Sequence, residues 1–273
     1  MLDMKMRLIS MLGVLTAIVI TFLILDYFHI LRRPVRLGMG VAVLAMLAGV
    51  ALTLNAILPE SNFFGPVFSE VKTAQKIVAL TFDDGPDPPY TGQILDILAE
   101  HQVPATFFLI GANAAKYPDL VRRIVAEGHQ IGNHTYHHID LLKVDRETVA
   151  AEIDQTNQVL RAAVGFVPHV VRPPHGFRDP VVMEVMSSRN MNVVEWSVMS
   201  KDWTNPGVEA IVRRTIGKVQ NGSVILLHDG DGIANVANRD QTVAATRQII
   251  VELSAKGYKF VTVDEILQAT EGK

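Results

Sequence analysis

The chain has 273 residues, which is enough for one large domain and an additional segment. Its formal net charge of −3 provides no basic surface for nucleic acid, and the absence of cysteine excludes disulfides, thiolate metal sites and a cysteine nucleophile. Hydrophobic residues make up 49% of the chain, which is high for a soluble enzyme, and the excess lies near the N-terminus.

Two apolar runs, residues 8–31 and 37–58, are each long enough to span a bilayer. The connector between them carries three arginines and no acidic residue, so the positive-inside rule places it in the cytoplasm. We expect residues 1–59 to form a two-helix transmembrane hairpin in the cell membrane, with the rest of the chain on the extracytoplasmic side. The alternatives are a signal peptide cleaved after the first run, and a single span followed by a membrane-associated helix.

Residues 60–74 have the composition of a linker, and strand-like and helix-like segments alternate through the domain that follows, residues 75–273. Strands are predicted at residues 76–82, 105–110, 129–133, 169–172, 192–198, 223–227 and 260–263. Helices are predicted at residues 91–102, 118–127, 146–163, 180–189, 208–219, 241–256 and 264–269. About seven β/α units in about 200 residues indicate an α/β fold with a parallel sheet, most simply a barrel or near-barrel.

The candidate acids, bases and ligands follow directly after predicted strands. They form five groups in chain order: Asp83-Asp84, His134-Thr135-Tyr136-His137-His138, Arg172-Pro173-Pro174-His175-Gly176, Asp202-Trp203 and His228-Asp229. Each group alone has an ordinary structural explanation, such as a solvated turn. Because the carboxyl ends of parallel strands meet at one edge of a sheet, we expect the groups to lie together and to form an active site.

The histidines indicate a metal site. His134 and His138 are four residues apart, so a helical turn after the third strand would place them on one face, where they could hold one ion. His137 lies near that face and is an alternative ligand. With Asp84 they make a set of two histidines and one carboxylate, which leaves coordination positions open for water and substrate. These ligands fit Zn²⁺ best, and also Fe²⁺, Co²⁺, Ni²⁺ or Mn²⁺.

Two further residues are expected to face the same edge. Arg172 stands at a strand end beside two prolines, and this position favours a pairing with the Asp83 carboxylate over a plain surface charge. His228 follows a fully apolar strand, and it either points into the pocket or caps the barrel; its neighbours favour the pocket.

The groups, in this order, resemble the motifs of the family 4 carbohydrate esterases, the polysaccharide deacetylases that contain the NodB homology domain. The similar segments are Thr81-Phe82-Asp83-Asp84-Gly85-Pro86, His134-Thr135-Tyr136-His137-His138, Arg172-Pro173-Pro174-His175-Gly176, Trp196 to Trp203, and Leu226-Leu227-His228. The resemblance covers about residues 75–267, and the first two motifs together are highly specific.

The resemblance implies a distorted (β/α) barrel that removes acetyl groups from N-acetylated sugars with the help of a divalent metal ion. Asp84, His134 and His138 would hold this ion. Asp83 would be the general base, and Arg172 would orient it.

The resemblance also implies roles for five further residues. His228 would be the general acid, and Asp202 would tune its pKa. Trp203 and Leu226 would line the pocket for the acetyl methyl group. The backbone N–H of His175 would donate to the oxyanion of the tetrahedral intermediate.

Two positions depart from the family pattern. His175 replaces an aromatic residue, most often Tyr, in the third motif. Any residue except proline supplies the backbone N–H, so this change affects the pocket wall and the choice of substrate more than the chemistry. Met199 stands where the fourth motif usually begins with Asp, but Asp202 is retained as the partner of His228.

We therefore expect hydrolytic N-deacetylation of an envelope polysaccharide such as peptidoglycan, with a glycan polymer and the lipid bilayer as partners. Three other functions fit parts of the sequence. An O-acetyl esterase of the acetyl-xylan type would use the same scaffold, and a glycan-binding membrane protein would retain the site with little catalysis. A non-haem iron oxygenase also uses two histidines and one carboxylate, although the alternating β/α pattern argues against it.

Overall fold

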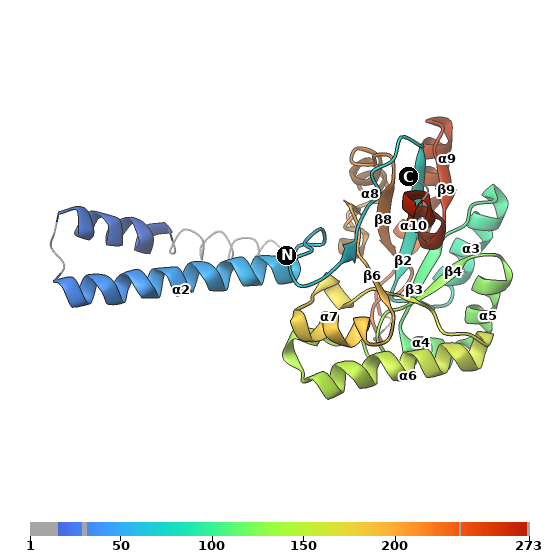
Figure 1. Ribbon diagram of the computed structural model, residues 1–273. Coiled ribbons are helices and arrows are strands. Elements are labelled where there is room, and N and C mark those ends of the chain that lie inside the picture. Colours follow the sequence, from blue (N-terminus) through green and yellow to red (C-terminus); the bar gives the residue numbers. More distant parts are fainter. Residues whose placement is uncertain (1–15, 29–31, 235, 272–273) are drawn as a thin grey trace. The chain divides into compact units, whose positions relative to one another are not determined.

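The computed structural model describes residues 16–28, 32–234 and 236–271 (Figure 1). The chain divides into two compact units, Met1–Asn55 and Ala56–Lys273. Within the described residues, one helix, α2 (Arg33–Ile57), is long and apolar enough to cross a membrane, and a shorter apolar helix covers Thr16–Tyr27. The first predicted span, residues 8–31, lies partly outside the described residues, so the two-helix hairpin remains a prediction.

The second unit is built on a nine-stranded sheet with the order β1-β6-β5-β4-β3-β2-β8-β7, and β9 pairs with β2. All of the strand pairs are parallel. The strands are β1 (Val67–Phe68), β2 (Ile77–Asp83), β3 (Thr106–Leu109), β4 (Gln130–Asn133), β5 (Val170–Val171), β6 (Asn192–Val194), β7 (Val198–Met199), β8 (Ser223–His228) and β9 (Lys259–Val261).

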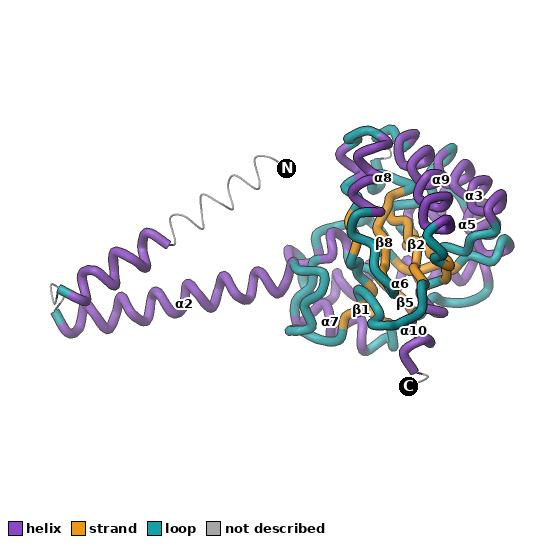
Figure 2. The backbone as a smooth tube through the Cα atoms, turned by 90° about the horizontal axis from the view of Figure 1, so that it is seen from above, coloured by secondary structure: helices purple, strands orange, loops and turns teal. Residues whose placement is uncertain are grey.

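The sheet curls without closing (Figure 2). Strands β1 and β7 end the strand order, and no pairing joins them within the described part of the chain. The predicted parallel α/β fold is confirmed, and the predicted distorted barrel takes the form of an open, curled half-barrel.

Helices surround the sheet (Figure 1). These helices are α3 (Tyr90–His101), α4 (Gly111–Lys116), α5 (Pro118–Ala126), α6 (Arg146–Val164), α7 (Pro180–Ser187), α8 (Val208–Ile216), α9 (Asp240–Ala255) and α10 (Val263–Glu271). Neighbours pack on one another, with α9 between α3 and α8, and α6 against α4, α5 and α7. Helices cover the outer face of the sheet, and every residue of its central strands β2 and β3 is buried.

The central strand β2 has two chemically different faces. All seven of its residues are buried. Val78, Leu80 and Phe82 point to the helices and belong to the largest apolar cluster. The alternate residues include Thr81 and Asp83, which therefore share the inner face of the curled sheet. This alternation places a carboxylate inside the half-barrel, where the strand ends.

Three local features differ from the predicted elements. The single strand predicted at residues 192–198 is two strands, because β6 pairs with β1 and β5 whereas β7 pairs with β8. The segment predicted as a linker, residues 60–74, contains β1. The short helix α4 was not predicted. Strands and helices this short carry too few residues for a periodic pattern, so long-range pairing decides them.

Candidate active site

The chain reverses direction where β2 ends. Asp84 directly follows β2 and has a φ of 76°, a left-handed conformation that ends the extended strand. Its carbonyl oxygen accepts a hydrogen bond of 2.8 Å from Asn113 Nδ2, and the carbonyl oxygen of Asp83 accepts one of 3.1 Å from the Asp229 N–H. Gly85 must lack a side chain, because a Cβ there would lie 2.1 Å from Asp229 Oδ2. The turn therefore fixes two adjacent carboxylates at the inner edge of the sheet.

Three ligand atoms converge beside this turn. His134 Nε2 lies 3.4 Å and His138 Nε2 lies 3.3 Å from Asp84 Oδ1. His134 Nδ1 is 2.7 Å from the carbonyl oxygen of Arg172. A carbonyl oxygen only accepts hydrogen bonds, so Nδ1 carries the proton and the Nε2 lone pair faces Asp84.

This cluster fits a cation. Asp84 Oδ1 is buried, and no described residue donates a hydrogen bond to it. Asp84, His134 and His138 each offer one atom within 4.8 Å of the others, which is the arrangement of a metal site. An acceptor left without a donor between two imidazole nitrogens is what a divalent ion would satisfy.

The pKa values of Asp84, His134 and His138 are shifted by burial and by the charges of neighbouring groups. Burial disfavours the ionised form of Asp84, but the nearby imidazoles of His134, His138 and His228 hold its pKa well below the usual range. Burial opposes protonation of His134, yet the Asp83 and Asp84 carboxylates raise its pKa. Burial, and then the charge of His134, lowers the pKa of His138 to about 4. The two carboxylates thus attract positive charge to the cluster, and the His138 imidazole stays neutral near pH 7.

The two histidines meet through a turn, and not through the helical turn after Asn133 that would also have placed them on one face. Thr135 and His138 have φ values of 64° and 54°, which are left-handed and not helical. The Asn133 side chain accepts from the Thr135 N–H at 2.8 Å, and the Thr135 hydroxyl accepts from the His138 N–H at 3.1 Å. These bonds replace a helical ladder and bring His138 back towards His134.

His137 belongs to a different contact. Its Nδ1 lies 2.6 Å from Glu152 Oε1, and Glu152 Oε2 accepts from the N–H groups of Tyr136 and His137. The His137 imidazole is therefore engaged away from Asp84. Glu152 was not among the predicted site residues, because a glutamate within a long amphipathic helix gives no functional signal.

Arg172 is paired with Asp83 as expected. Its Nη1 donates to Asp83 Oδ1 at 2.6 Å and to the Thr81 hydroxyl at 2.9 Å. The guanidinium is fully buried and lies 4.0 Å from the centre of the Phe108 ring. Asp83 Oδ2 remains on the side of the histidine cluster, 3.9 Å from His134 Nε2. Arg172 therefore fixes one carboxylate oxygen and leaves the other directed at the site.

His228 and Asp202 form a second pair. Asp202 Oδ1 lies 3.0 Å from His228 Nδ1, and Asp202 Oδ2 accepts from the His228 N–H at 2.8 Å. Hydroxyl groups of Ser200 and Thr242 also donate to this carboxylate, and neither was predicted. Burial disfavours the imidazolium, but the charge and hydrogen bond of Asp202 raise the pKa of His228 to about 9.

The remaining predicted residues lie around these groups. The exposed His175 ring is 5.0 Å from the His138 ring, and the half-buried Trp203 ring is 5.1 Å from the His228 ring. Leu226 is buried on β8 and pairs in register with Met199 on β7. All predicted groups thus stand on the strand ends of one edge.

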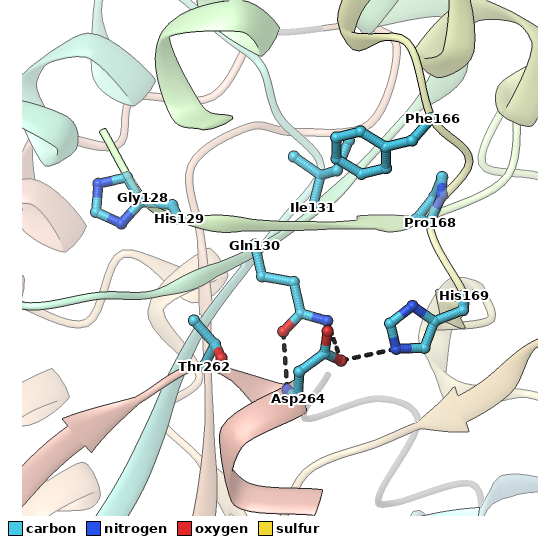
Figure 3. Close-up of a pocket in the computed structure, with 9 residues that line it drawn as sticks. All are labelled: Gly128, His129, Gln130, Ile131, Phe166, Pro168, His169, Thr262 and Asp264. Atoms are coloured by element: carbon cyan, nitrogen blue, oxygen red, sulfur yellow. Dashed lines mark hydrogen bonds and ion pairs between the residues drawn. The ribbon is translucent and has the colours of Figure 1, made fainter. Parts of the chain in front are cut away.

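A further pocket lies where β4 and β5 begin (Figure 3). Its volume is about 220 Å³, and Phe166 forms part of its wall. Asp264 bonds to both Gln130 and His169 across it. No residue predicted for the active site lines this pocket.

Comparison with known proteins agrees with this geometry. Residues 70–194 match the family model described as polysaccharide deacetylase. The chain is 44% identical to a chitooligosaccharide deacetylase of Sinorhizobium fredii, over 68% of this chain and 89% of that protein. It is 40% identical to a peptidoglycan-N-acetylglucosamine deacetylase of Bacillus cereus, over 75% of this chain and 94% of that protein.

Solved structures show the same fold. A peptidoglycan N-acetylglucosamine deacetylase superimposes with a TM-score of 0.69 at 39% identity, covering 73% of this chain and 91% of the other. A pseudoenzyme of carbohydrate esterase family 4 (CE4) from Bacillus anthracis superimposes with a TM-score of 0.67 at 28% identity, covering 74% of this chain and 69% of the other.

Proposed function

The chain belongs to the polysaccharide deacetylase family, and we propose that it hydrolyses the N-acetyl groups of N-acetylglucosamine in peptidoglycan with one divalent metal ion. The observation that carries the proposal is the convergence of the Asp84–His134–His138 cluster with the Asp83–Arg172 and Asp202–His228 pairs at one sheet edge. Relatives named for peptidoglycan and for chitooligosaccharides support this substrate class, because both glycans contain N-acetylglucosamine.

Asp84, His134 and His138 would hold the ion, and Zn²⁺ suits this donor set of two imidazoles and one carboxylate. The unpartnered Asp84 Oδ1 supports this assignment. When bound, a divalent ion polarises an acyl oxygen and lowers the pKa of water. The carbonyl oxygen of Arg172 holds His134 in the tautomer that such a ligand requires.

Asp83 is proposed as the general base. Its Oδ1 is held by Arg172, while Oδ2 faces the cluster where the attacking water would lie. Asp83 would accept the proton of that water as the water attacks the acetyl carbon. Arg172 keeps the carboxylate from rotating, because its guanidinium is itself fixed by the carbonyl oxygens of Val194 and Glu195.

His228 is proposed as the general acid. An amine is a poor leaving group unless its nitrogen is protonated as the C–N bond breaks. His228 carries a proton at neutral pH because Asp202 raises its pKa to about 9. Asp202 occupies Nδ1, so Nε2 is the atom that would give its proton to the departing sugar nitrogen.

The remaining pocket residues would bind the acetyl group. The His175 N–H is proposed to donate to the oxyanion, and Trp203 and Leu226 would contact the methyl group. His175 in place of the usual aromatic residue would change the wall that the neighbouring sugar meets.

We propose a membrane anchor at the N-terminus, with two passes and the catalytic unit on the extracytoplasmic side. The length and composition of α2 support one span. Arg36 Nε lies 2.5 Å from Asp26 Oδ1, which supports an antiparallel hairpin of the two apolar segments. On that side of the membrane, peptidoglycan is the nearest N-acetylated polymer.

The test is acetate release by the full-length protein in detergent, stripped of metal and resupplied with Zn²⁺, Co²⁺ or Mn²⁺. Substrates are peptidoglycan, N-acetylglucosamine oligomers and O-acetylated xylan, with Asp83→Asn as the control. We expect metal-restored release from the first two substrates and none from the control. Release from xylan alone would identify an O-acetyl esterase instead.

A second candidate is a glycan-binding protein with little catalysis. The pseudoenzyme among the similar structures and the departures at His175 and Met199 favour it. In that case the metal-loaded chain would bind peptidoglycan without releasing acetate, and His175→Tyr together with Met199→Asp would restore release.

A further inference from the structure

Arg178 is a buried cation that binds main-chain carbonyl groups from two separate segments. It is 1% exposed. Its Nη1 donates to the Gly176 carbonyl oxygen at 2.7 Å. Its Nη2 lies 2.7, 3.2 and 2.8 Å from the carbonyl oxygens of Leu58, Pro59 and Ser61. A guanidinium has its donors in a fixed planar fork, so it holds these two segments in one relative position.

The first of these segments is the end of α2 and the turn after it. The Arg178 N–H also donates to the Ala56 carbonyl oxygen at 3.0 Å. The last carbonyl groups of a helix have no partner within the helix, and the helix dipole favours a cation beside them. Arg178 meets both needs, and residues Ala56–Ser61 are thereby part of the catalytic unit.

The second segment is the turn that carries His175. His175 and Gly176 have φ values of 61° and 73°. Two successive left-handed residues, one of them not glycine, persist only where their surroundings hold them. The Gly176 N–H bonds to the Pro173 carbonyl oxygen at 2.9 Å, and Arg178 holds the Gly176 carbonyl oxygen. The direction of the His175 N–H therefore depends on Arg178.

Glu195 lies against the same turn. It is fully buried, its Oε1 is 3.6 Å from Arg178 Nη1, and neither carboxylate oxygen has a hydrogen-bond partner among the described residues. A Cβ on Gly176 would lie 2.7 Å from Glu195 Oε2. Burial raises the pKa of Glu195 to about 8, against the opposing charge of Arg178. The turn is thus enclosed between a buried arginine and a buried carboxyl group.

Resting on the deacetylase function proposed above, we propose that Arg178 is a positioning residue. It ties Ala56–Ser61, at the end of the apolar helix, to the turn that directs the His175 N–H into the active site. The segment that leaves the membrane anchor is accordingly a working part of the catalytic site and not a passive tether.

The first test compares Arg178→Met and Arg178→Lys in the full-length, metal-loaded protein, with Arg189→Met as the matched control. Arg189 is half-buried and bonds Asp154 on the outside of the molecule. We expect Arg178→Met to lower kcat per bound metal ion about 10- to 100-fold with KM changed less than about 2-fold, as a small misplacement of a catalytic group would. Arg178→Lys should recover part of the loss, because its ammonium group can still donate to a carbonyl.

The second test moves the segment and leaves Arg178 in place. Two residues, Gly-Ser, are inserted between Leu58 and Pro59, and the same insertion between Thr73 and Ala74 is the control. Only the first insertion should lower kcat per bound metal ion, since only it separates the carbonyl groups that Arg178 binds.

The outcomes separate the two proposals. A wild-type chain that releases no acetate with any metal would overturn the proposed function and the positioning role with it. An active wild-type chain whose Arg178→Met variant keeps its kcat, or whose two insertions behave alike, would overturn the positioning role alone. Loss of thermal stability in Arg178→Met with unchanged kcat per bound metal ion would count in the same way.

Discussion

Histidine and aspartate side chains form two clusters at opposite ends of β4, and the clusters differ in how their hydrogen bonds are satisfied. Where β4 begins, Asp264 Oδ1 receives Gln130 Nε2 at 2.6 Å and lies 2.9 Å from His169 Nε2 (Figure 3). Where β4 ends, Asp84 Oδ1 lies between two imidazole nitrogens and receives no hydrogen bond from any described residue.

The difference shows which cluster needs a ligand. Polar groups that satisfy one another, as at Asp264, stabilise a loop and a helix start and need no ligand. A buried acceptor without a donor is rare in folded proteins and requires an explanation. At Asp84 that explanation is a cation, and the same residue types therefore form a structural contact at one end of a strand and a metal site at the other.

The largest expected effect separates the two clusters directly. His134→Ala removes a ligand and should abolish metal binding and lower acetate release by at least about 1000-fold, since the metal activates both water and substrate. His169→Ala should keep metal and change the rate less than about 2-fold, as a substitution remote from the chemistry. Metal content and acetate release measured on both variants test this contrast, and equal losses would contradict it.

The next effect distinguishes the base from the metal ligands within the active site. Asp83→Asn should retain the metal, because Asp83 is not in the cluster, yet it should lose about 100- to 10,000-fold in kcat for want of a base. The matched control is Asp84→Asn, which should lose the metal as well. A normal rate in Asp83→Asn would remove Asp83 from the mechanism.

The pH dependence tests the Asp202–His228 pair. The folded pKa of His228 is raised to about 9, so its protonated form is complete near neutrality and is lost as pH rises through about 9. As the general acid, it should make kcat fall over that range. Asp202→Asn removes the charge that raises the pKa, and the fall should move to lower pH by at least about one unit. An alkaline limb that does not move would exclude His228 as the acid.

The smallest effect is expected at the cluster where β4 begins, in which the polar groups bond to one another. Asp264→Asn keeps an oxygen that can accept from Gln130 but weakens the contact with His169, so it should cost about 0.5–1.5 kcal/mol of stability. A melting temperature lower by about 2–4 °C with unchanged acetate release would fit. A large loss of activity would give this pocket a functional role.

The fold, and the edge of the sheet that carries the active site, were largely predictable from the sequence for physical reasons. Long strands and helices such as β2 and α6 carry enough residues for a clear pattern. The convergence of Asp83, Arg172 and His228 follows from the rule that the ends of parallel strands meet at one edge.

Other features of the site depend on contacts that no local pattern encodes. The turn that joins His134 to His138 is set by hydrogen bonds to Asn133 and Thr135, so spacing alone suggested a helix. The role of Arg178 arises from carbonyl groups more than 100 residues away in the chain. Arg178 also lies outside the motifs, so nothing in the sequence pointed to it.

The most direct test of the metal cluster is a titration of the metal-free, full-length protein with Zn²⁺, in which bound ions and acetate released from N-acetylglucosamine oligomers are measured together. We predict that activity rises in proportion to binding and saturates at about one ion per chain, as expected for a single three-ligand site. His138→Ala should abolish both signals, whereas His137→Ala, whose imidazole bonds Glu152, should keep both. Full activity in the metal-free protein, or loss of the ion in His137→Ala but not in His138→Ala, would contradict the metal site described here.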